Sequence, residues 1–356
     1  MKKNILVDFS KYDAMCGFGE ICRNYAPKLA ERHYDDLHFV YLIPEKWRGY
    51  FGADVDYIST EKAKKELREY TGRIDLWHST DQQFKHSFKN IRYRPLTLLT
   101  IHDLNYLYEK KGIHKWRHIF EMKHFVRMYE HIAVISDFVK NDVERNFNLH
   151  GRKVTRIYNG ISNIQTRPKQ KPEFVAHEGE KFFFTIGQVR AKKNFKTLVP
   201  MMDYFPDYKL YICGDDHWSY SDEIRQAVKP EDRNRILVTG KISEAEKCWL
   251  YDNCAAFLFP STLEGFGIPV LEAMRFKAKV VSSKFTCLPE VCGQYASYWD
   301  DYSPEHMADV VKRAITGYNK ESDYAVNACK HSMGFNYDRY TDEYVELYRK
   351  ILAYRI

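Results

Sequence analysis

Residues 259 to 274 read Phe259-Pro-Ser-Thr-Leu-Glu264-Gly-Phe-Gly-Ile-Pro269-Val-Leu-Glu272-Ala-Met274, and their pattern indicates how the chain folds. The apolar run that ends at Phe259 predicts a buried strand, the two glycines predict a loop, and Pro269 suits the first turn of a helix. Glu264 then lies on the loop and Glu272 inside the helix. A strand that turns directly into a helix is the building unit of α/β proteins with parallel sheets.

The same unit recurs along the chain. Short runs rich in β-branched and aromatic residues, bounded by turns, predict strands in each half. In the first half these runs are Ile5–Phe9, Phe39–Ile43, Leu76–His78, Thr97–Ile101, Ile132–Ile135 and Val154–Tyr158. In the second half they are Phe182–Ile186, Leu210–Cys213, Ile236–Val238, Ala256–Phe259 and Lys279–Ser282. Helical stretches between the runs, such as Phe18–His33 and Ile113–Tyr129, indicate two successive α/β domains.

The boundary between the domains is predicted in the polar segment Gln165–Pro172, which contains two prolines. We therefore expect a first domain over residues 1–165 and a second over residues 166–335, with a cleft between them. Residues 336–356 contain aromatic and aliphatic side chains at helical spacing, which predicts a terminal amphipathic helix.

The two glutamates of the first stretch are candidates for binding. A rise of about 1.5 Å per helical residue, together with the loop, places their carboxylates roughly 10 Å apart. That separation is too large for a carboxylate pair acting on one glycosidic bond. It suits two hydroxyl-binding groups, for a hexose and a ribose, at opposite ends of a diphosphate that faces the helix amides. The alternative is a plain helix entry with one capping and one surface glutamate.

A second strand-to-helix loop, Thr185–Phe195, concentrates positive charge. It carries Arg190, Lys192 and Lys193. Fixed cations can stabilise the negative charge that develops on a departing nucleoside diphosphate, without a metal ion. Solvent-facing side chains in a surface loop are the alternative.

The first half contains two further candidates. Gly17, Phe18 and Gly19 open the first predicted helix and supply flexible backbone for a phosphate, although the third glycine of a dinucleotide fingerprint is missing. His102 and Asp103 end a strand, which is where α/β sheets present ligand contacts. A plain loop-to-helix junction and a buried structural histidine are the respective alternatives.

Composition limits the class of protein. The chain has 356 residues, of which 44% are hydrophobic and 15% aromatic. No apolar run approaches the roughly 18 residues of a membrane span. The eight cysteines include no C-x-x-C pair, and we expect them to be reduced thiols in the cytosol.

All of the excess positive charge lies in the first half. Residues 1–165 contain 28 Lys/Arg and 21 Asp/Glu, whereas residues 166–356 contain 27 of each. The segment Gln82–His131 combines ten basic and four acidic residues with aromatic residues that include Phe84, Phe88, Tyr93, Trp116, Phe120 and Phe125. Such a segment suits an anionic partner, for example a phospholipid headgroup or a polyprenyl diphosphate. A solvated helix face is the alternative.

These motifs, in this order, resemble a known family. Glu264–Glu272 is similar to the E-x7-E motif of the retaining glycosyltransferases of family 4. Gly187–Asn194 is similar to their basic loop, and Cys287–Val291 to the segment that follows the motif. Landmarks of the first half that also match are Gly17–Gly19, Thr100–Leu104, Ile135–Phe138 and Tyr158–Gly160. The resemblance covers nearly the whole chain and implies the GT-B fold: two facing Rossmann-like parallel-sheet domains, an inter-domain cleft and a C-terminal helix that crosses back onto the first domain.

The resemblance also implies roles for individual residues. Those expected at the reacting sugar and the leaving diphosphate are His102, Arg190, Lys193 and Glu264. Those expected to bind the donor are Gly17, Phe18, Gly19, Gly187, Gly240, Gly265, Phe266, Gly267, Ile268 and Glu272. Glu264 would contact sugar hydroxyls, Glu272 the ribose, and Lys193 with Arg190 the diphosphate.

Three positions depart from the family pattern. Gln188 stands where many relatives have Arg or Thr directly after the glycine. Lys241 follows Gly240, where relatives often have an aromatic residue beside the nucleobase. Lys277 stands where a glycine is expected after the helix that contains Glu272, so this helix lacks its usual C-terminal cap.

The implied activity is transfer of a hexose from a nucleotide diphosphate sugar to a hydroxyl of a glycan or lipid-linked glycan, with retention at the anomeric carbon. We expect mannose from GDP-mannose, because the basic loop resembles that of bacterial polysaccharide mannosyltransferases; a UDP-hexose is the alternative. No metal or other cofactor is expected. The expected location is cytoplasmic, at the inner face of the membrane if the basic first domain contacts anionic lipid.

Other classes of protein stay open. A metal-dependent transferase would use Asp54-Val-Asp56, the only D-x-D of the sequence, which we expect in a surface loop. A nucleotide-sugar epimerase or a phosphorylase can share two facing Rossmann-like domains. A non-catalytic protein could bind polyanions through the first half, whereas nucleic-acid binding is not expected because the charge is modest and no known module is present.

Overall fold

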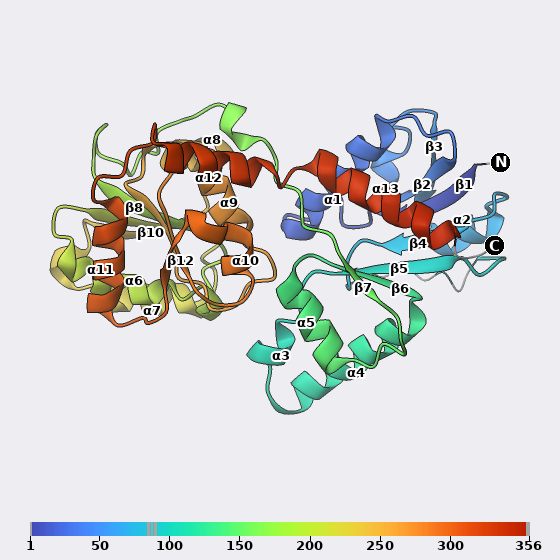
Figure 1. Ribbon diagram of the computed structural model, residues 1–356, viewed down its shortest axis with the longest axis horizontal. Coiled ribbons are helices and arrows are strands. Elements are labelled where there is room, and N and C mark those ends of the chain that lie inside the picture. Colours follow the sequence, from blue (N-terminus) through green and yellow to red (C-terminus); the bar gives the residue numbers. More distant parts are fainter. Residues whose placement is uncertain (1, 84–85, 87, 89–90, 354–356) are drawn as a thin grey trace. The chain divides into compact units, whose positions relative to one another are not determined.

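The computed structural model describes residues 2–83, 86, 88 and 91–353. The chain folds into two compact units (Figure 1): Met1–Ser162 with Phe335–Ile356 form the first, and Asn163–Gly334 form the second. The predicted boundaries, at residues 165 and 335, lie within a few residues of these points. Phe84 of the basic segment and residues 354–356 of the predicted terminal helix lie outside the described residues.

The first unit is built on a sheet of seven strands that pair in parallel. The strands are β1 (Lys3–Asp8), β2 (Leu37–Ile43), β3 (Val55–Ser59), β4 (Leu76–Ser79), β5 (Leu96–Ile101), β6 (His131–Val134) and β7 (Val154–Arg156). Their order is β3-β2-β1-β4-β5-β6-β7, so β4 is the middle strand. Almost all residues of β1, β4 and β5 are buried, as the continuous apolar runs predict for a parallel sheet.

The last helix of the chain packs onto the first unit. The helices of this unit are α1 (Gly17–Ala30), α2 (Ala63–Glu69), α3 (Tyr106–Glu109), α4 (Gly112–Met128), α5 (Asp137–Asn146) and α13 (Tyr337–Ala353). Figure 1 shows α13 beside α1, with which it is in contact. The hydroxyls of Tyr25 and Tyr348 lie 2.8 Å apart, and the rings of Tyr25 and Tyr340 meet edge to face at 4.9 Å. The amphipathic pattern predicted for residues 336–356 is therefore the contact surface of α13.

The second unit contains a six-stranded parallel sheet. Its strands are β8 (Phe182–Ile186), β9 (Lys209–Cys213), β10 (Ile236–Gly240), β11 (Ala256–Phe259), β12 (Val280–Ser283) and β13 (Ser297–Trp299), in the order β10-β9-β8-β11-β12-β13. Its helices are α6 (Leu198–Met201), α7 (Ser219–Ala227), α8 (Glu244–Asn253), α9 (Ile268–Arg275), α10 (Leu288–Cys292), α11 (Pro304–Ile315) and α12 (Asp323–Met333). The prediction of two α/β domains with parallel sheets is confirmed. Because β8 and β11 are neighbours, the two loops singled out in the sequence leave adjacent strands.

Two strands were not predicted, β3 and β13. Val55 and Asp56 belong to β3, so the prediction of a surface loop for Asp54-Val-Asp56 is wrong at these two residues. The Asp56 carboxylate accepts a hydrogen bond from the Tyr70 hydroxyl at 2.7 Å and lies 3.1 Å from Nε2 of His38. The strand is at the edge of the sheet, where polar residues are common. Its apolar run is too short to have predicted a strand from the sequence.

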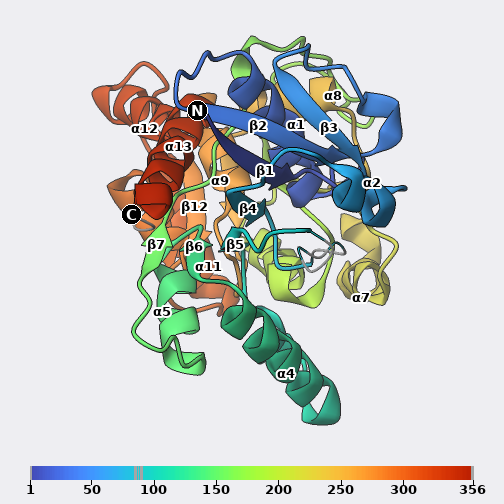
Figure 2. The same cartoon turned by 90° about the vertical axis from the view of Figure 1, so that its right-hand side faces the viewer.

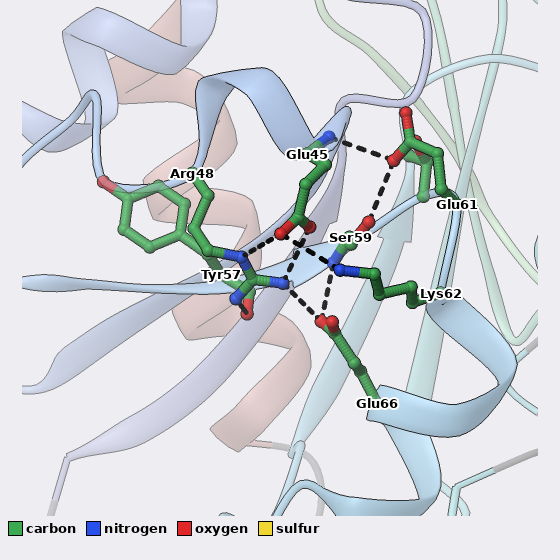
Figure 3. A network of polar contacts seen from close by, with 8 residues as sticks. Glu45, Arg48, Tyr57, Ser59, Glu61, Lys62 and Glu66 are labelled. Atoms are coloured by element: carbon green, nitrogen blue, oxygen red, sulfur yellow. Dashed lines mark hydrogen bonds and ion pairs between the residues drawn. The ribbon is translucent and has the colours of Figure 1, made fainter.

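A network of polar contacts ties β3 to its neighbours (Figure 3). Glu66 of α2 accepts hydrogen bonds from the backbone N–H of Ser59 at 2.8 Å and from Nη2 of Arg48 at 2.6 Å. Glu61 accepts one from the backbone N–H of Glu45 at 3.0 Å, and this bond lowers the pKa of Glu61 to about 2. Charged side chains thus help to hold β3 at the edge of the sheet.

The longest helices, α4 and α13, have 17 residues each. Across the described ranges, no helix is both long enough and apolar enough to cross a bilayer.

Candidate functional site

The basic loop runs across the ends of β8 and β9. The backbone N–H of Gly187 donates to the carbonyl of Cys213 at 3.1 Å, and that of Val189 to the carbonyl of Asp215 at 2.8 Å. Gly214 has a φ of 120°, and a Cβ at this residue would lie 2.0 Å from the carbonyl oxygen of Gly187. Only glycine permits this approach of the two strand ends, which fixes the path of the loop.

The loop ends in a buried ion pair between two predicted site residues. Nζ of Lys193 lies 2.5 Å from Oε1 of Glu264, and each side chain is only 12% exposed. The ammonium group also lies 5.0 Å from the centre of the Phe259 ring. The backbones meet as well, because the N–H of Thr262 donates to the carbonyl of Lys192 at 2.9 Å. The structure therefore brings together a cation and a carboxylate that the sequence predicted on separate loops.

The glycine-rich loop before α9 is fixed at both ends. Gly267 caps α9 with a φ of 95°, and a Cβ there would lie 2.7 Å from Cδ2 of Leu288. The backbone N–H of Glu264 donates to Oγ1 of Thr286 at 3.3 Å, and the Cys287 thiol donates to the carbonyl of Glu264 at the same distance. The predicted donor-binding residues of this loop that follow Glu264 are Gly265, Phe266, which is buried, and Ile268, which is the first residue of α9.

Glu272 is buried in α9 and held by two residues of α8. One carboxylate oxygen accepts a hydrogen bond from the Tyr251 hydroxyl at 3.0 Å, and the other lies 3.2 Å from Nζ of Lys247. Burial raises the pKa of Tyr251 well above its ordinary value, and the charge of Glu272 acts in the same direction. Tyr251 is therefore a permanent donor. The predicted surface glutamate alternative is wrong for Glu272.

Sequence reasoning missed Lys247 and Tyr251, although a signal was present. Ser243 and Glu246 form a capping box that begins α8. Lys247 and Tyr251 are four residues apart and share one face of that helix. The capping box predicts the helix, but only the packing of α8 on α9 shows which carboxylate this face meets.

Arg190 lies against Trp218, and Gly240 lies near Asp216. The guanidinium of Arg190 is 4.7 Å from the centre of the Trp218 ring. Gly240 has a φ of 75°, and a Cβ there would lie 3.5 Å from Oδ1 of Asp216. Lys241, the departure from the family pattern, is 3.6 Å from the carboxylate of Asp215. Arg190 thus lies against the Trp218 ring.

In the first unit, His102 is buried at the end of β5. Its Nε2 donates to the carbonyl of Thr80 at 2.8 Å, and since a carbonyl can only accept, Nε2 carries the proton. Burial lowers the pKa of His102, so the ring is neutral near pH 7, with a lone pair at Nδ1. The Phe18 ring meets it edge to face at 5.0 Å. Gly17, Phe18 and Gly19 form the first turn of α1, and a Cβ on Gly19 would lie 1.9 Å from the carbonyl of Ala14.

A buried carboxyl group, Asp8, lies at the end of β1 and was not predicted. Its Oδ1 accepts from the backbone N–H of Ser10 at 2.9 Å, whereas Oδ2 has no hydrogen-bond partner in the described part of the chain. Burial raises the pKa of Asp8 to about 7. The Thr80 hydroxyl donates to the carbonyl of Asp8 at 2.6 Å, so Thr80 links Asp8 to His102. The available signal was its place at the end of a central strand, as for His102.

Among the described residues there is no group of three or more His, Cys, Asp or Glu side chains arranged for a metal ion. The expectation of a reaction without metal or other cofactor stays a prediction.

Both halves of the chain match known family models. Residues 20–163 match the model described as Glycosyltransferase Family 4, and residues 166–331 match the one described as Glycosyl transferases group 1. The matches leave only two residues between them and meet where the structure divides into its units.

Among curated proteins, the chain is similar to the O-antigen chain mannosyltransferase RfbU of Salmonella typhimurium. The two are 28% identical over 204 residues, which is 56% of this chain and 55% of the relative. It is also similar to the O-antigen chain mannosyltransferase B of Escherichia coli, at 30% identity over 175 residues, 46% of this chain and 45% of the relative. The chain thus spans about half the length of these curated relatives.

Among solved structures, the fold matches the sucrose-phosphate synthase of Thermosynechococcus elongatus. The TM-score is 0.72 at 16% identity, and the match covers 99% of this chain and 100% of that one. This likeness concerns the fold alone. Together the two family models cover most of the chain, and they show that it belongs to the family 4 glycosyltransferases, which have the GT-B fold.

Proposed function

We propose that the protein transfers a hexose, mannose from GDP-mannose, to a hydroxyl of a glycan acceptor with retention at the anomeric carbon. The observation that carries this proposal is the ion pair of Lys193 with Glu264, at the carboxyl ends of two adjacent central strands. Parallel sheets bind ligands at this edge. The curated relatives named as O-antigen mannosyltransferases support the choice of sugar.

The chemistry follows from the groups present. Glu264 accepts hydrogen bonds from hydroxyls of the sugar, and Lys193 lies against the diphosphate, where it offsets the charge that grows as the bond from the anomeric carbon to the phosphate oxygen breaks. Glu272 accepts from the ribose hydroxyls. The ammonium group of Lys247 pairs with it, and the Tyr251 hydroxyl orients it. Arg190 adds positive charge at the same loop.

In the proposed reaction, retention follows because the acceptor attacks the face of the sugar from which the phosphate leaves. The leaving phosphate oxygen takes the proton of the acceptor hydroxyl while that hydroxyl bonds to the same face of the anomeric carbon. No side chain then has to act as nucleophile, and the protein contributes positioning and electrostatic stabilisation. His102 is neutral and fixed through Nε2, and the family resemblance assigns it to positioning the sugar. Analysis of the product by NMR checks the anomer: an inverted configuration contradicts the mechanism.

The choice of nucleotide is tested by thermal unfolding with GDP, UDP, ADP and their sugars. A ligand at 100 times its dissociation constant stabilises the folded protein by about 2.7 kcal/mol. We expect this stabilisation with GDP and GDP-mannose. HepE of Anabaena, whose fold matches this chain with a TM-score of 0.72 at 16% identity over 98% of this chain and 100% of that one, was solved with UDP-glucose, which makes a UDP-hexose the second candidate. Stabilisation by UDP sugars alone selects it, and no stabilisation by any nucleotide contradicts glycosyl transfer.

The acceptor in this proposal is a glycan or a lipid-linked glycan, and the site of action is the cytoplasmic face of the membrane. The basic first unit would contact anionic lipid there. No metal is needed in the proposed reaction, so activity should persist in EDTA; complete loss that Mg²⁺ or Mn²⁺ restores would contradict this part.

A further inference from the structure

The outer face of α4 carries a stripe of large apolar side chains. Ile113, Trp116 and Phe120 are 78%, 68% and 75% exposed. Their spacing of three, four and seven positions places them on one face of the helix. Grouped apolar residues on a protein surface mark an interaction site rather than a packing defect.

The opposite face of α4 anchors it in the first unit. Met122 and Val126 are the buried residues of the helix, and the carbonyl of Val126 accepts from Nη1 of Arg152 at 2.5 Å. The ring of His118 lies 5.4 Å from that of Tyr106 in α3. Figure 2 shows α4 projecting beyond the sheet and α5 of this unit. The apolar stripe is therefore presented outward while the helix itself is held in place.

Basic residues extend the same face. Lys123 and Arg127 follow Phe120 by three and seven positions, and both are exposed. The helix contains four Lys/Arg and one Glu, and Lys110 and Lys111 directly precede it. A helix with apolar residues beside cations suits the interface of a bilayer that contains anionic lipid. A second copy of the chain fits poorly, because two such helices would repel each other.

We propose that this membrane face, defined as Ile113, Trp116, Phe120, Lys123 and Arg127, docks on a bilayer that contains anionic phospholipid. The apolar side chains enter the headgroup region, and the two cations lie against phosphates. The proposal rests on the proposed function for its purpose, delivery of a lipid-linked acceptor. It is tested without donor or acceptor, so that its failure is distinguishable from a failure of glycosyl transfer.

Co-sedimentation with vesicles is the test. The full chain is expected to bind phosphatidylcholine vesicles only when they contain phosphatidylglycerol, and to be released by high salt. Replacing both aromatic residues, W116S with F120S, should weaken binding about 100-fold. Replacing both cations, K123Q with R127Q, should weaken it about 30-fold. The matched controls are K64Q with K65Q on α2 of the same unit, and M333S for an exposed apolar residue elsewhere; both should bind like the wild type.

A second measurement keeps the test independent of folding. Brominated phosphatidylglycerol should quench the fluorescence of the wild type more than that of W116F, which keeps an aromatic ring and still binds. The other five tryptophans serve as the reference. Equal binding by the α4 variants, equal quenching of W116F, or self-association through α4 in place of vesicle binding would each overturn the proposal. Thermal unfolding in the absence of any nucleotide, with the same midpoint in all variants, separates this outcome from a folding defect.

Discussion

At the scale of single residues, Lys193 is the side chain with the clearest electrostatic task. Its ammonium group is nearly buried against Glu264 and the Phe259 ring, where a charge acts more strongly than in water. We predict that Lys193→Ala lowers turnover about 100-fold, because one lost charge contact in the transition state is equivalent to about 3 kcal/mol. Steady-state kinetics with the preferred donor measures this loss.

Lys196 supplies the matched control. It lies three residues after Lys193, but its ammonium group pairs with Glu223 at 3.3 Å on the surface of the unit. Lys196→Ala should keep turnover within about threefold of the wild type, since exposed ion pairs contribute little. Lys193→Ala turnover in that same range would remove Lys193 from the proposed role.

Glu272 is predicted to act on donor binding more than on turnover. Its carboxylate is already oriented by Tyr251 and Lys247, so it can accept from two ribose hydroxyls with little rearrangement. Glu272→Ala should raise the dissociation constant of the donor nucleotide about 30-fold, the effect of losing charged hydrogen bonds worth about 2 kcal/mol. Calorimetry measures it. A nucleotide without the ribose hydroxyls should bind both proteins equally; if it distinguishes them, the ribose assignment is wrong.

Asp8 makes a prediction about pH. Burial raises its pKa to about 7, whereas an unfolded chain has a value near 3.9. Between these values the folded state binds more protons than the unfolded state, so the free energy of unfolding falls as the pH rises through the window. Asp8→Asn removes this dependence, and its stability relative to the wild type should grow by up to about 4 kcal/mol between pH 4 and pH 7.

Denaturant unfolding at several pH values measures the effect. Asp54→Asn, at an exposed position of the same unit, serves as control and should follow the wild type at every pH. A constant difference between Asp8→Asn and the wild type across the window would show that Asp8 is ionised in the fold.

At the scale of elements, the end of α9 is strained by one residue. Lys277 has a φ of 54°, the left-handed conformation that favours glycine, and the residue after it closes the helix through a bond from Ala278 N–H to the carbonyl of Ala273 at 3.1 Å. A left-handed non-glycine residue costs about 1–2 kcal/mol. We predict that Lys277→Gly raises the free energy of unfolding by about 1 kcal/mol, because the exposed pair with Glu321 contributes little. Chemical denaturation that shows a loss instead would contradict it.

The sequence predicted the helices and strands better than the side-chain contacts between them. The strands β8 and β11 were predicted to the residue, because their apolar runs are continuous and end at Gly187 and Pro260. The edge strand β3 was missed because Asp56 interrupts its short apolar pattern. The local pattern of apolar residues predicts strands in the middle of a sheet well, and it predicts strands at the edge less well.

In the candidate site, too, the residues could be predicted from the sequence but their contacts could not. Glu264, Glu272 and Lys193 could be predicted as site residues because they lie in motifs with fixed spacing. The Lys193–Glu264 contact joins residues 71 positions apart, and Glu272 meets Tyr251 across 21 positions. Such pairs depend on strand order and helix packing, which no local spacing contains. Asp8 was not predicted for another reason. Its raised pKa depends on burial in the folded unit, not on the residues that neighbour it in the sequence.

At the scale of the whole molecule, the chain returns to its first unit to complete it. It leaves this unit at Ser162 and re-enters at Phe335. α13 then contributes Tyr348, whose hydroxyl lies 2.6 Å from Nδ1 of His78 in β4, and Tyr344, whose hydroxyl lies 2.7 Å from Oγ1 of Thr100 in β5. Burial lowers the pKa of His78 to about 3, so this network is neutral. A helix bonded to the middle of the sheet is part of the core of the unit, not an appendage.

This arrangement predicts that the two units respond differently to a change in α13. Tyr344 is fully buried and stacks on His78 at 4.9 Å, so Tyr344→Ala should lower the stability of the first unit by about 3–5 kcal/mol. Hydrogen exchange should then accelerate at β1, β4 and β5 while β8 and β11 keep their protection. Tyr93→Ala, at a half-exposed position of the same unit, should change neither set. Equal acceleration in both sheets would mean that the units unfold as one, and unchanged exchange in β4 would mean that α13 is not part of the core of the first unit.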